Sequence, residues 1–413
     1  MLYGLIGEKL GHSFSKEIHE ALAGYDYQLC PLSRDEFAAF MQAADFTAIN
    51  VTIPYKEAVI PYLDKIDERA AAIGAVNTIV NQKGMLMGYN TDFDGVCYLL
   101  RRHNISLKDR QVLILGTGGT SKTVTAVAHH LGAADVQTVS RGGGKGLLNY
   151  RDAEDWGKAE VIINTTPRGM YPHNDDEPLL DLRKFPHLQA VADVIYNPLQ
   201  TRLILQAKEL GLTACGGLEM LVAQAKYAAE HFLGRQFADE EIERIYQRLR
   251  QNKLNIALIG MPGSGKTTVG KLLAEALGKP LVDADEALEQ QAGRTIPHIF
   301  AEDGEDHFRR LESEVIARIS QEGGQIIATG GGVVLRPENI QNLRQNSLLI
   351  WLDKQPEHLA LDDNRPLSPD VEANLRLYQQ RHPLYRAAAD IVIVNEGTAE
   401  TAAAEIIRQF SQY

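Results

Sequence analysis

The sequence predicts an α/β protein, and two strand–glycine-loop–helix units are the main evidence for this fold class. In the first unit the apolar segment Gln111–Leu115 runs into the glycine-rich residues 116–119. In the second, Asn255–Ile259 runs into residues 260–265. Short apolar segments alternate with helical patterns after both units, which is typical of parallel βαβ connections. With 413 residues, the chain has room for two or three such domains.

Composition narrows the possible class of protein. Hydrophobic residues make up 44% of the chain and charged residues 23%, which favours a buried core over disorder. The formal charge is −12, which argues against nucleic acid or an anionic membrane as a partner but allows small anionic ligands where basic residues gather. No apolar run reaches about 18 residues and the first residues do not resemble a signal peptide. Three widely spaced cysteines indicate free thiols in the cytoplasm.

The first glycine loop has the context of a dinucleotide-binding fingerprint, with an apolar strand before it and a helix after it. Gly116 and Gly118 take the first two fingerprint positions, Gly119 follows them, and Ser121 stands where a third glycine is usual. Backbone N–H groups at the start of the helix would face a pyrophosphate. Alone, the motif also fits an ordinary tight turn.

The next expected strand indicates which dinucleotide binds. Asp135–Val139 ends at Ser140 and Arg141, where an NAD site would have an Asp or Glu for the ribose 2′-hydroxyl. Arg141, with Lys145 four residues later, suits a 2′-phosphate instead. We therefore expect NADP(H), and the alternative is two solvated basic residues on a loop.

Seven short motifs run in order through residues 1–250. They are Gly11-His-Ser13-Phe-Ser15, Asn50-Val-Thr52-Ile-Pro54-Tyr-Lys56, Ile73-Gly-Ala-Val-Asn77-Thr78, Gly88-Tyr-Asn90-Thr-Asp92, Ile163-Asn-Thr-Thr-Pro-Arg-Gly169-Met170, Asp193-Val-Ile-Tyr196-Asn-Pro198 and Gly217-Leu-Glu-Met-Leu-Val-Ala-Gln224. Together these motifs resemble the shikimate dehydrogenases. The resemblance implies NADPH-dependent reduction of 3-dehydroshikimate to shikimate.

The same resemblance implies roles for single residues. Lys56 and Asp92 look like the catalytic pair. Lys56 would donate a proton to the alkoxide that develops when hydride reduces the ketone, and the Asp92 carboxylate would hold the Lys56 ammonium group in place. Ser13 and Ser15 alternate, so on an extended segment both hydroxyls would face the substrate carboxylate. The other residues implied are Thr52, Asn77, Tyr196 and Gln224 for the substrate and Gly217 for the cofactor.

A helix expected over residues 219–232 indicates that the substrate domain is built from two separate segments of the chain. Its apolar stripe contains Met220, Leu221, Ala225 and Ala228, and it would return to pack on the N-terminal region. We therefore expect a discontinuous substrate domain (1–95 plus 216–250) and a Rossmann NADP-binding domain (96–215).

The second glycine loop matches the phosphate-binding pattern G-x-x-x-x-G-K-[ST] between a strand and a helix. Its amides would form an anion nest, Lys266 would reach the β- and γ-phosphates of ATP, and Thr267 would ligate Mg²⁺. The residues assigned to the nucleotide are Gly263, Ser264, Gly265, Lys266, Thr267 and Thr268.

Further motifs of this half are Asp283-Ala-Asp285, Phe308-Arg309 with Glu312, Gly330-Gly-Gly332, Asn364-Arg365-Pro-Leu367 and Arg381-His-Pro-Leu-Tyr385. With the glycine loop they resemble the shikimate kinases, which implies a C-terminal P-loop domain (254–413) similar to the nucleoside monophosphate kinases. The resemblance implies that Asp283 binds Mg²⁺, that Asp285 holds the acceptor hydroxyl and takes its proton, that Arg309 and Arg381 clamp the shikimate carboxylate, and that Arg365 is a lid arginine. Both aspartates are expected to point the same way after a short strand, and Gly331 and Gly332 would let the backbone approach the substrate ring.

The two resemblances imply a fusion that reduces 3-dehydroshikimate to shikimate and then phosphorylates shikimate to shikimate 3-phosphate. One alternative is a quinate/shikimate dehydrogenase fused to a kinase of another small polyol. The other is a catalytically inactive regulator that senses shikimate or quinate. The segment 358–363 before Arg365 is short and acidic, which puts the nucleotide contacts of a lid there in doubt.

Overall fold

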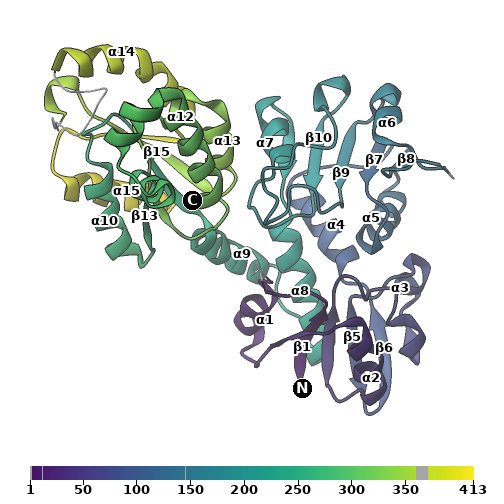
Figure 1. The fold of residues 1–413 in the computed structure, drawn as a ribbon. Helices are drawn as coiled ribbons and strands as arrows, with labels where there is room; N and C mark the ends of the chain where they lie inside the picture. The colour runs from purple at the N-terminus through teal and green to yellow at the C-terminus, as the bar shows by residue number, and fades with distance from the viewer. Residues whose placement is uncertain (1, 12, 145, 360–370) are drawn as a thin grey trace. The chain divides into compact units, whose positions relative to one another are not determined.

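The structure is a computed structural model that describes residues 2–11, 13–144, 146–359 and 371–413. Within this part the chain forms three β-sheets with helices packed on them, which confirms the α/β class (Figure 1). The chain divides into two compact units. Unit 1 comprises residues 1–168, 177–197 and 206–248, and unit 2 comprises residues 169–176, 198–205 and 249–413. Lys145 and Arg365, both predicted site residues, lie outside the described residues.

The first sheet of unit 1 is mixed, with the strand order β2-β1-β3-β5-β6-β4. Its strands are β1 (Tyr3–Gly7), β2 (Gln28–Pro31), β3 (Ala48–Val51), β4 (Lys65–Ile66), β5 (Thr78–Gln82) and β6 (Met85–Tyr89). The helices between them are α1 (Ser15–Ala23), α2 (Arg34–Ala43), the 3₁₀ turn η1 (Ile60–Tyr62) and α3 (Glu68–Ile73). β5 pairs antiparallel with both β3 and β6, and a short turn joins β5 to β6 as a hairpin.

The second sheet of unit 1 is entirely parallel, in the order β11-β10-β9-β7-β8. Its strands are β7 (Gln111–Leu115), β8 (Asp135–Val139), β9 (Val161–Asn164), β10 (Ala190–Asp193) and β11 (Thr213–Cys215). The helical segments around it are α4 (Asp92–Arg102), α5 (Gly119–His130), α6 (Tyr150–Trp156), η2 (Leu182–Lys184) and α7 (Arg202–Glu209). β7 and β8 have the bounds that the sequence predicts.

Helix α8 (Leu218–Leu233) carries the chain back to the first sheet, as its apolar pattern predicts. Ala228 and Phe232 are buried in one cluster with Leu5 of β1, so the helix packs on the N-terminal strands. The helix ends at Gly234, which takes a left-handed conformation with φ 63°. Helix α9 (Glu240–Lys253) follows it.

Unit 2 contains a five-stranded parallel sheet in the order β13-β14-β12-β15-β16. Its strands are β12 (Asn255–Ile259), β13 (Leu281–Asp283), β14 (Ile326–Ala328), β15 (Ser347–Asp353) and β16 (Ile391–Val394). The helical segments are α10 (Lys266–Leu277), α11 (Ala284–Ala292), α12 (Ile296–Ile319), η3 (Val333–Leu335), α13 (Pro337–Arg344), η4 (Pro356–His358), α14 (Val371–Ala388) and α15 (Ala399–Phe410).

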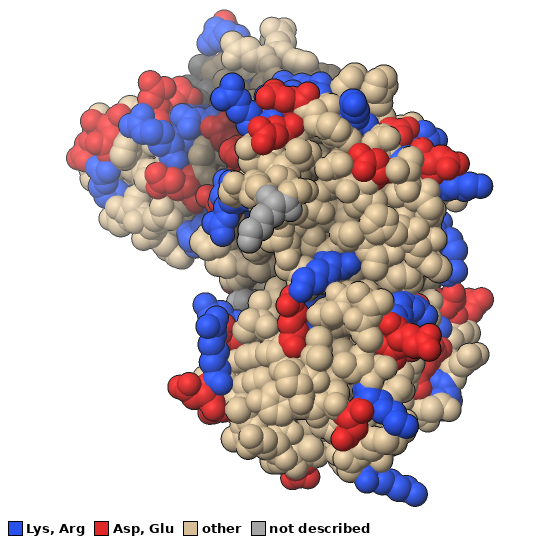
Figure 2. All heavy atoms as spheres, turned by 90° about the vertical axis from the view of Figure 1, so that its right-hand side faces the viewer, with Lys and Arg blue, Asp and Glu red and all other residues tan. Residues whose placement is uncertain are grey.

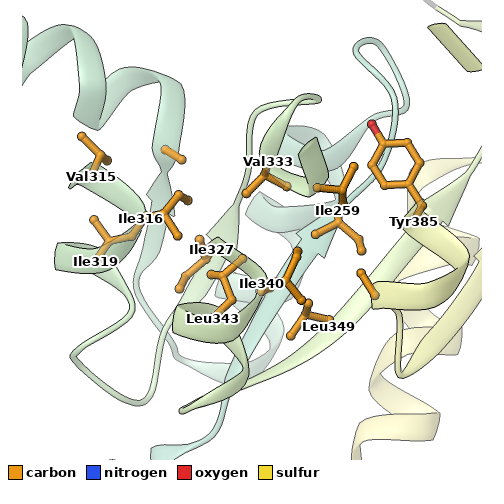
Figure 3. Close-up of a cluster of buried hydrophobic side chains, with 14 of the residues drawn as sticks. Ile259, Val315, Ile316, Ile319, Ile327, Val333, Ile340, Leu343, Leu349 and Tyr385 are labelled. Carbon is orange, nitrogen blue, oxygen red and sulfur yellow. The ribbon is translucent and has the colours of Figure 1, made fainter. Parts of the chain in front are cut away.

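The core of unit 2 explains why its central strands are continuously apolar. Every residue of β12 is buried, because helices cover both faces of the sheet. Figure 3 shows one side of this core, where strand residues meet helices α12 and α13. The labelled members are Ile259, Ile327 and Leu349 from the strands and Val315, Ile316, Ile319, Val333, Ile340, Leu343 and Tyr385 from the surrounding segments.

The surface carries charges of both signs (Figure 2), and the three cysteines are thiols without disulfide bonds. Figure 2 shows acidic and basic side chains intermixed over one face. Cys30 and Cys97 are partly buried, Cys215 is buried, and all three are free thiols. No helix within the described ranges has the length and apolar character needed to cross a membrane.

Buried His19 makes the stability of unit 1 sensitive to acid. Its ring is fully buried and stacks on Tyr27, with ring centroids 4.2 Å apart. Burial lowers its pKa to about 3. Because the unfolded chain then binds the proton more readily, stability should be lost as the pH falls below about 6.5, by about 2 kcal/mol at pH 5. Urea unfolding between pH 5 and 7 should show this loss for the wild type and not for His19→Phe.

The matched control is His298→Gln, because His298 is exposed. This variant should keep the wild-type dependence of unfolding free energy on pH. An identical pH dependence in His19→Phe and the wild type would contradict the assignment to His19.

Candidate active sites

Lys56 and Asp92, the predicted catalytic pair of unit 1, form an ion pair. Lys56 Nζ lies 2.6 Å from Asp92 Oδ2, and the two side chains are only 14% and 8% exposed. Lys56 follows β3, and its carbonyl accepts a hydrogen bond from Val76 N. Asp92 is the first residue of α4, where the helix dipole stabilises a carboxylate. The ammonium group is therefore held at a defined position close to solvent.

A buried hydrogen-bond network fixes the start of α4. Asn77 Nδ2 donates to Thr91 Oγ1 at 3.1 Å and lies 3.4 Å from Gln224 Oε1, while Thr91 N donates to Asn77 Oδ1 at 2.8 Å. Thr91 directly precedes Asp92, so two predicted substrate residues, Asn77 and Gln224, lie beside the catalytic pair. Thr91 was not predicted as a site residue, although it lies inside the motif Gly88-Tyr-Asn90-Thr-Asp92.

Ser13 and Ser15 lie together, but not for the reason that the sequence suggested. The prediction of an extended segment is wrong, because Ser15 begins α1 and the intervening Phe14 has helical angles (φ −85°, ψ −1°). Ser13 Oγ nevertheless donates to Ser15 Oγ at 3.1 Å. The ring of Phe14 packs against Tyr196, with ring centroids 5.2 Å apart. Thus three predicted substrate residues gather around Phe14.

Thr52 occupies the same turn as Lys56. Thr52 O accepts from Tyr55 N at 2.9 Å. Its methyl group approaches Gly7 so closely that a Cβ there would be 2.5 Å away. The turn is therefore packed tightly onto the end of β1.

The first glycine loop meets the catalytic pair. A Cβ at Gly119 would lie 3.7 Å from both Cβ and Cδ of Lys56. Gly116 has φ 110°, and Ser121 Oγ donates to its carbonyl at 2.6 Å, which explains how serine replaces the third glycine. At Gly118 a Cβ would meet nothing within 4 Å, so the loop backbone has an open face. A nucleotide on this face would lie beside the Lys56 side chain.

The remaining predicted cofactor residues of unit 1 lie at the carboxyl edge of the second sheet. Ser140 follows β8, and its hydroxyl accepts from Gly143 N at 3.1 Å. Arg141 is exposed. Gly217 packs so closely that a Cβ would be 2.1 Å from Val194 O. Packing therefore requires glycine at position 217, and the contact of Gly217 with the cofactor stays a prediction.

The second glycine loop has the geometry of a phosphate cradle. Gly260, Gly263 and Gly265 all have positive φ, at 147°, 78° and 93°. Lys266 is buried, and its ammonium group donates to Gly260 O at 3.0 Å and to Met261 O at 2.8 Å. Ser264 Oγ is buried with no hydrogen-bond partner among the described residues. Thr268 is exposed on the first turn of α10.

Two oxygen groups lie together next to this loop. Thr267 Oγ1 donates to Asp283 Oδ2 at 2.8 Å. Asp283 ends β13 and caps helix α11, where its side chain accepts from Asp285 N at 3.0 Å, so Asp285 belongs to the first turn of a helix. That the two carboxylates point the same way stays a prediction. Burial, and next the charge of Asp283, raise the pKa of Asp285 to about 6.

The glycine run 330–332 lies between the phosphate loop and two buried arginines. A Cβ at Gly331 would be 2.5 Å from Pro262 Cδ, and a Cβ at Gly332 would be 2.0 Å from Arg309 Nη1. Arg381 Nη1 donates to Gly331 O at 2.9 Å. The predicted residues Arg309 and Arg381 therefore converge on one short segment of backbone.

Glu312 holds Arg309 in this arrangement. Its Oε2 lies 2.8 Å from Arg309 Nη1, and both side chains are buried. Burial raises the pKa of Glu312, and the charge of Arg309 opposes that rise. The role of Glu312 was not predicted from the sequence. The spacing of three residues on a helix was the available signal.

Comparison with known proteins identifies both halves. Family models match the "Shikimate dehydrogenase substrate binding domain" at residues 5–79 and "Shikimate kinase" at residues 262–411. The chain is 34% identical over 269 residues to a shikimate dehydrogenase (NADP(+)) of Clostridium perfringens, covering 60% of this chain and 98% of the relative. It is 37% identical over 246 residues to a shikimate dehydrogenase (NADP(+)) of Clostridium beijerinckii, covering 55% of this chain and 90% of the relative.

Solved structures agree with this result. A chorismate mutase/shikimate 5-dehydrogenase fusion protein from Clostridium acetobutylicum has a TM-score of 0.57 and 32% identity, covering 60% of this chain and 97% of that chain. Shikimate 5-dehydrogenase from Thermus thermophilus, in complex with NADP(H) and shikimate, has a TM-score of 0.55 and 28% identity, covering 60% and 99%. Quinate dehydrogenase from Corynebacterium glutamicum, in complex with NAD, has a TM-score of 0.54 and 28% identity, covering 60% of this chain and 98% of that chain. The chain belongs to the shikimate dehydrogenase family and carries a shikimate kinase domain towards its C-terminal end.

Proposed function

We propose that this chain catalyses two consecutive reactions. The N-terminal half reduces 3-dehydroshikimate to shikimate with NADPH, and the C-terminal half phosphorylates shikimate to shikimate 3-phosphate with ATP and Mg²⁺. The observation that carries the proposal is the same in both halves: a nucleotide loop touches the residues expected to hold the substrate. Gly119 lies against Lys56, and Pro262 lies against Gly331.

In the reduction, Lys56 serves as the proton donor. Bound NADPH supplies the hydride, and the ketone oxygen becomes an alkoxide that needs a proton. The Lys56 ammonium group gives up that proton, and Asp92, 2.6 Å away, keeps the ammonium group at its position. Ser13 and Ser15 donate hydrogen bonds to the substrate carboxylate, while Asn77 and Gln224 bind the ring hydroxyls.

The residues of unit 1 fit the dinucleotide. The open face of the loop at Gly118, at the N-terminus of α5, suits a pyrophosphate. Arg141 stands where an NAD site would have an acid, so its guanidinium group favours the 2′-phosphate of NADP(H). The preference for this cofactor therefore comes from charge at the carboxyl edge of β8.

In the phosphorylation, Asp285 accepts the proton of the attacking hydroxyl. The carboxylate lies beside Gly330, where a Cβ would be 2.7 Å from Asp285 Oδ1. Arg309 and Arg381 bind the substrate carboxylate, and Arg offers the bidentate geometry for it. Lys266 binds the phosphates from the loop, where positioning and charge stabilisation account for most of the catalysis.

The residues next to the loop also fit the metal. Thr267 Oγ1 and the Asp283 carboxylate supply the hard oxygen donors that Mg²⁺ prefers, and Mg²⁺ usually takes only one or two such protein ligands. When bound, the ion neutralises charge on the transferring phosphates. The hydroxyl of Ser264 in the same loop is buried with no hydrogen-bond partner among the described residues, which supports a role as a donor to a phosphate oxygen.

We also propose the domain limits 1–95 plus 216–250, 96–215 and 254–413, and a cytoplasmic location. Three free thiols support a reducing compartment. Quinate is the second candidate substrate of unit 1, because one similar structure is a quinate dehydrogenase. Measured kcat/KM values with shikimate and NADP⁺ should exceed those with quinate and NAD⁺. Higher kcat/KM values with quinate and NAD⁺ would show that quinate is the preferred substrate of unit 1.

The two activities should be separable by single substitutions. Lys56→Met removes the proton donor, so kcat/KM for 3-dehydroshikimate reduction should fall about 10³-fold, while the rate of shikimate phosphorylation stays unchanged. Lys266→Ala should lower phosphorylation at least about 10²-fold and leave the reduction unchanged. Each variant is the control for the other. Full reductase activity in Lys56→Met would contradict the assigned chemistry of unit 1.

The close contact of Gly332 with Arg309 gives a second test. In Gly332→Ala the added methyl group displaces the guanidinium group, so the KM for shikimate should rise about tenfold or more. The KM for ATP should change little, because the phosphate loop is intact. Steady-state kinetics of phosphorylation measures both constants. An unchanged KM for shikimate would show that Arg309 does not bind the substrate.

A further inference from the structure

The loop after β9 contains an arginine for which the reaction described above has no use. We propose that Arg168 is a second arginine for the 2′-phosphate of NADP(H), acting together with Arg141 and setting the preference for NADPH over NADH. This inference rests on the proposed reductase function of unit 1, and it adds a specificity residue to that site.

Strand order brings the loop of Arg168 to the nucleotide. In the parallel sheet β7 lies between β8 and β9, so the loops after all three strands meet at one edge. From β7 the chain passes to β8 on one side, and it then crosses to β9 on the other side of β7. In parallel sheets, ligands bind at the point where the strand order reverses in this way. A Cβ at Gly116 would be 2.8 Å from Thr165 Oγ1 and 3.1 Å from Thr166 Cγ2. The two loops are therefore in contact.

Hydrogen bonds hold the loop after β9 in one conformation. Thr166 N and Thr166 Oγ1 both donate to Asn164 Oδ1, at 3.0 and 2.7 Å. Asn164 Nδ2 donates in turn to the buried carboxylate of Asp193 at 3.0 Å. Arg168 N donates to Thr166 Oγ1 at 3.3 Å. The backbone that carries Arg168 is thus fixed relative to the glycine loop.

Arg141 and Arg168 stand on the two loops that flank the glycine loop. Arg141 is the second residue after β8 and Arg168 is the fourth after β9, at the same edge of the sheet. Both arginine side chains are exposed. Tyr150 begins α6, just after a segment that pairs with the end of β8. Burial raises the pKa of the Tyr150 hydroxyl, and the positive charges of Arg141 and Arg168 both oppose that rise, so both charges lie near enough to act on this one side chain.

This arrangement suits a doubly charged phosphate monoester. Two guanidinium groups from separate loops can bind different oxygens of one phosphate. Arg168 Nε donates to Glu177 O at 3.1 Å, which restrains the direction of the side chain. A ribose 2′-hydroxyl offers no charge to either arginine. The pair therefore separates NADPH from NADH by electrostatics.

The test measures nucleotide binding without turnover. NADPH and NADH are titrated by their nicotinamide fluorescence, with Mg²⁺ and ADP present to fill the kinase site of the full chain. Arg168→Gln should weaken NADPH binding about tenfold or more and change NADH binding less than twofold. Arg168→Lys, which keeps the charge, should recover part of the loss. Arg141→Gln should behave like Arg168→Gln.

The matched control is Arg183→Gln, an exposed arginine of the same unit that pairs with Asp181. It should bind both nucleotides like the wild type. NADPH binding in Arg168→Gln within twofold of the wild type would overturn the proposal. Equal weakening of NADPH and NADH would also overturn it, because the residue would then only support the loop. A wild type that binds NADPH with this arginine dependence but does not reduce 3-dehydroshikimate would refute the proposed function alone.

Discussion

Both candidate sites depend on contact between a nucleotide loop and the residues expected to hold the substrate. A Cβ at Gly119 would stand in van der Waals contact with Lys56, at 3.7 Å, and a Cβ at Gly331 would overlap Pro262 of the phosphate loop. Group transfer requires the donor and the acceptor to approach within contact distance. The loops provide that approach, and the surrounding hydrogen bonds then fix the reacting side chains around them. The same constraint therefore governs a hydride-transfer site and a phosphoryl-transfer site on unrelated loops.

Local charge balance explains how an acidic chain can hold two sites for anions. Lys56 is paired with Asp92, and Arg309 is paired with Glu312, in each case with both partners largely buried. Removing charges from water is costly, and a close partner offsets that cost. The partner also leaves each cation at a defined position, ready for a ligand oxygen. The net charge of −12 therefore says little about the sites, because the relevant charges are arranged over a few ångströms.

The sequence predicted those features that depend on contiguous residues. Strands β7, β8 and β12 have the predicted bounds, because each is an apolar run followed by a polar or glycine-rich turn. One local geometry was wrong, at Ser15, because a helix begins there and replaces the two-residue alternation of a strand. The roles of Thr91 and Glu312 depend on partners that only the folded chain brings close. The antiparallel pairing of β5 in the first sheet was likewise not predicted.

The central claim is that one chain makes an intermediate and then consumes it. The most direct measurement starts from 3-dehydroshikimate, NADPH, ATP and Mg²⁺ with the purified full chain, and follows NADPH oxidation and ADP release together. The account predicts that, after a lag in which shikimate accumulates, one ADP appears for each NADPH oxidised, and that ADP release depends on NADPH. Sustained NADPH oxidation without ADP release, or ADP release without NADPH, would contradict it.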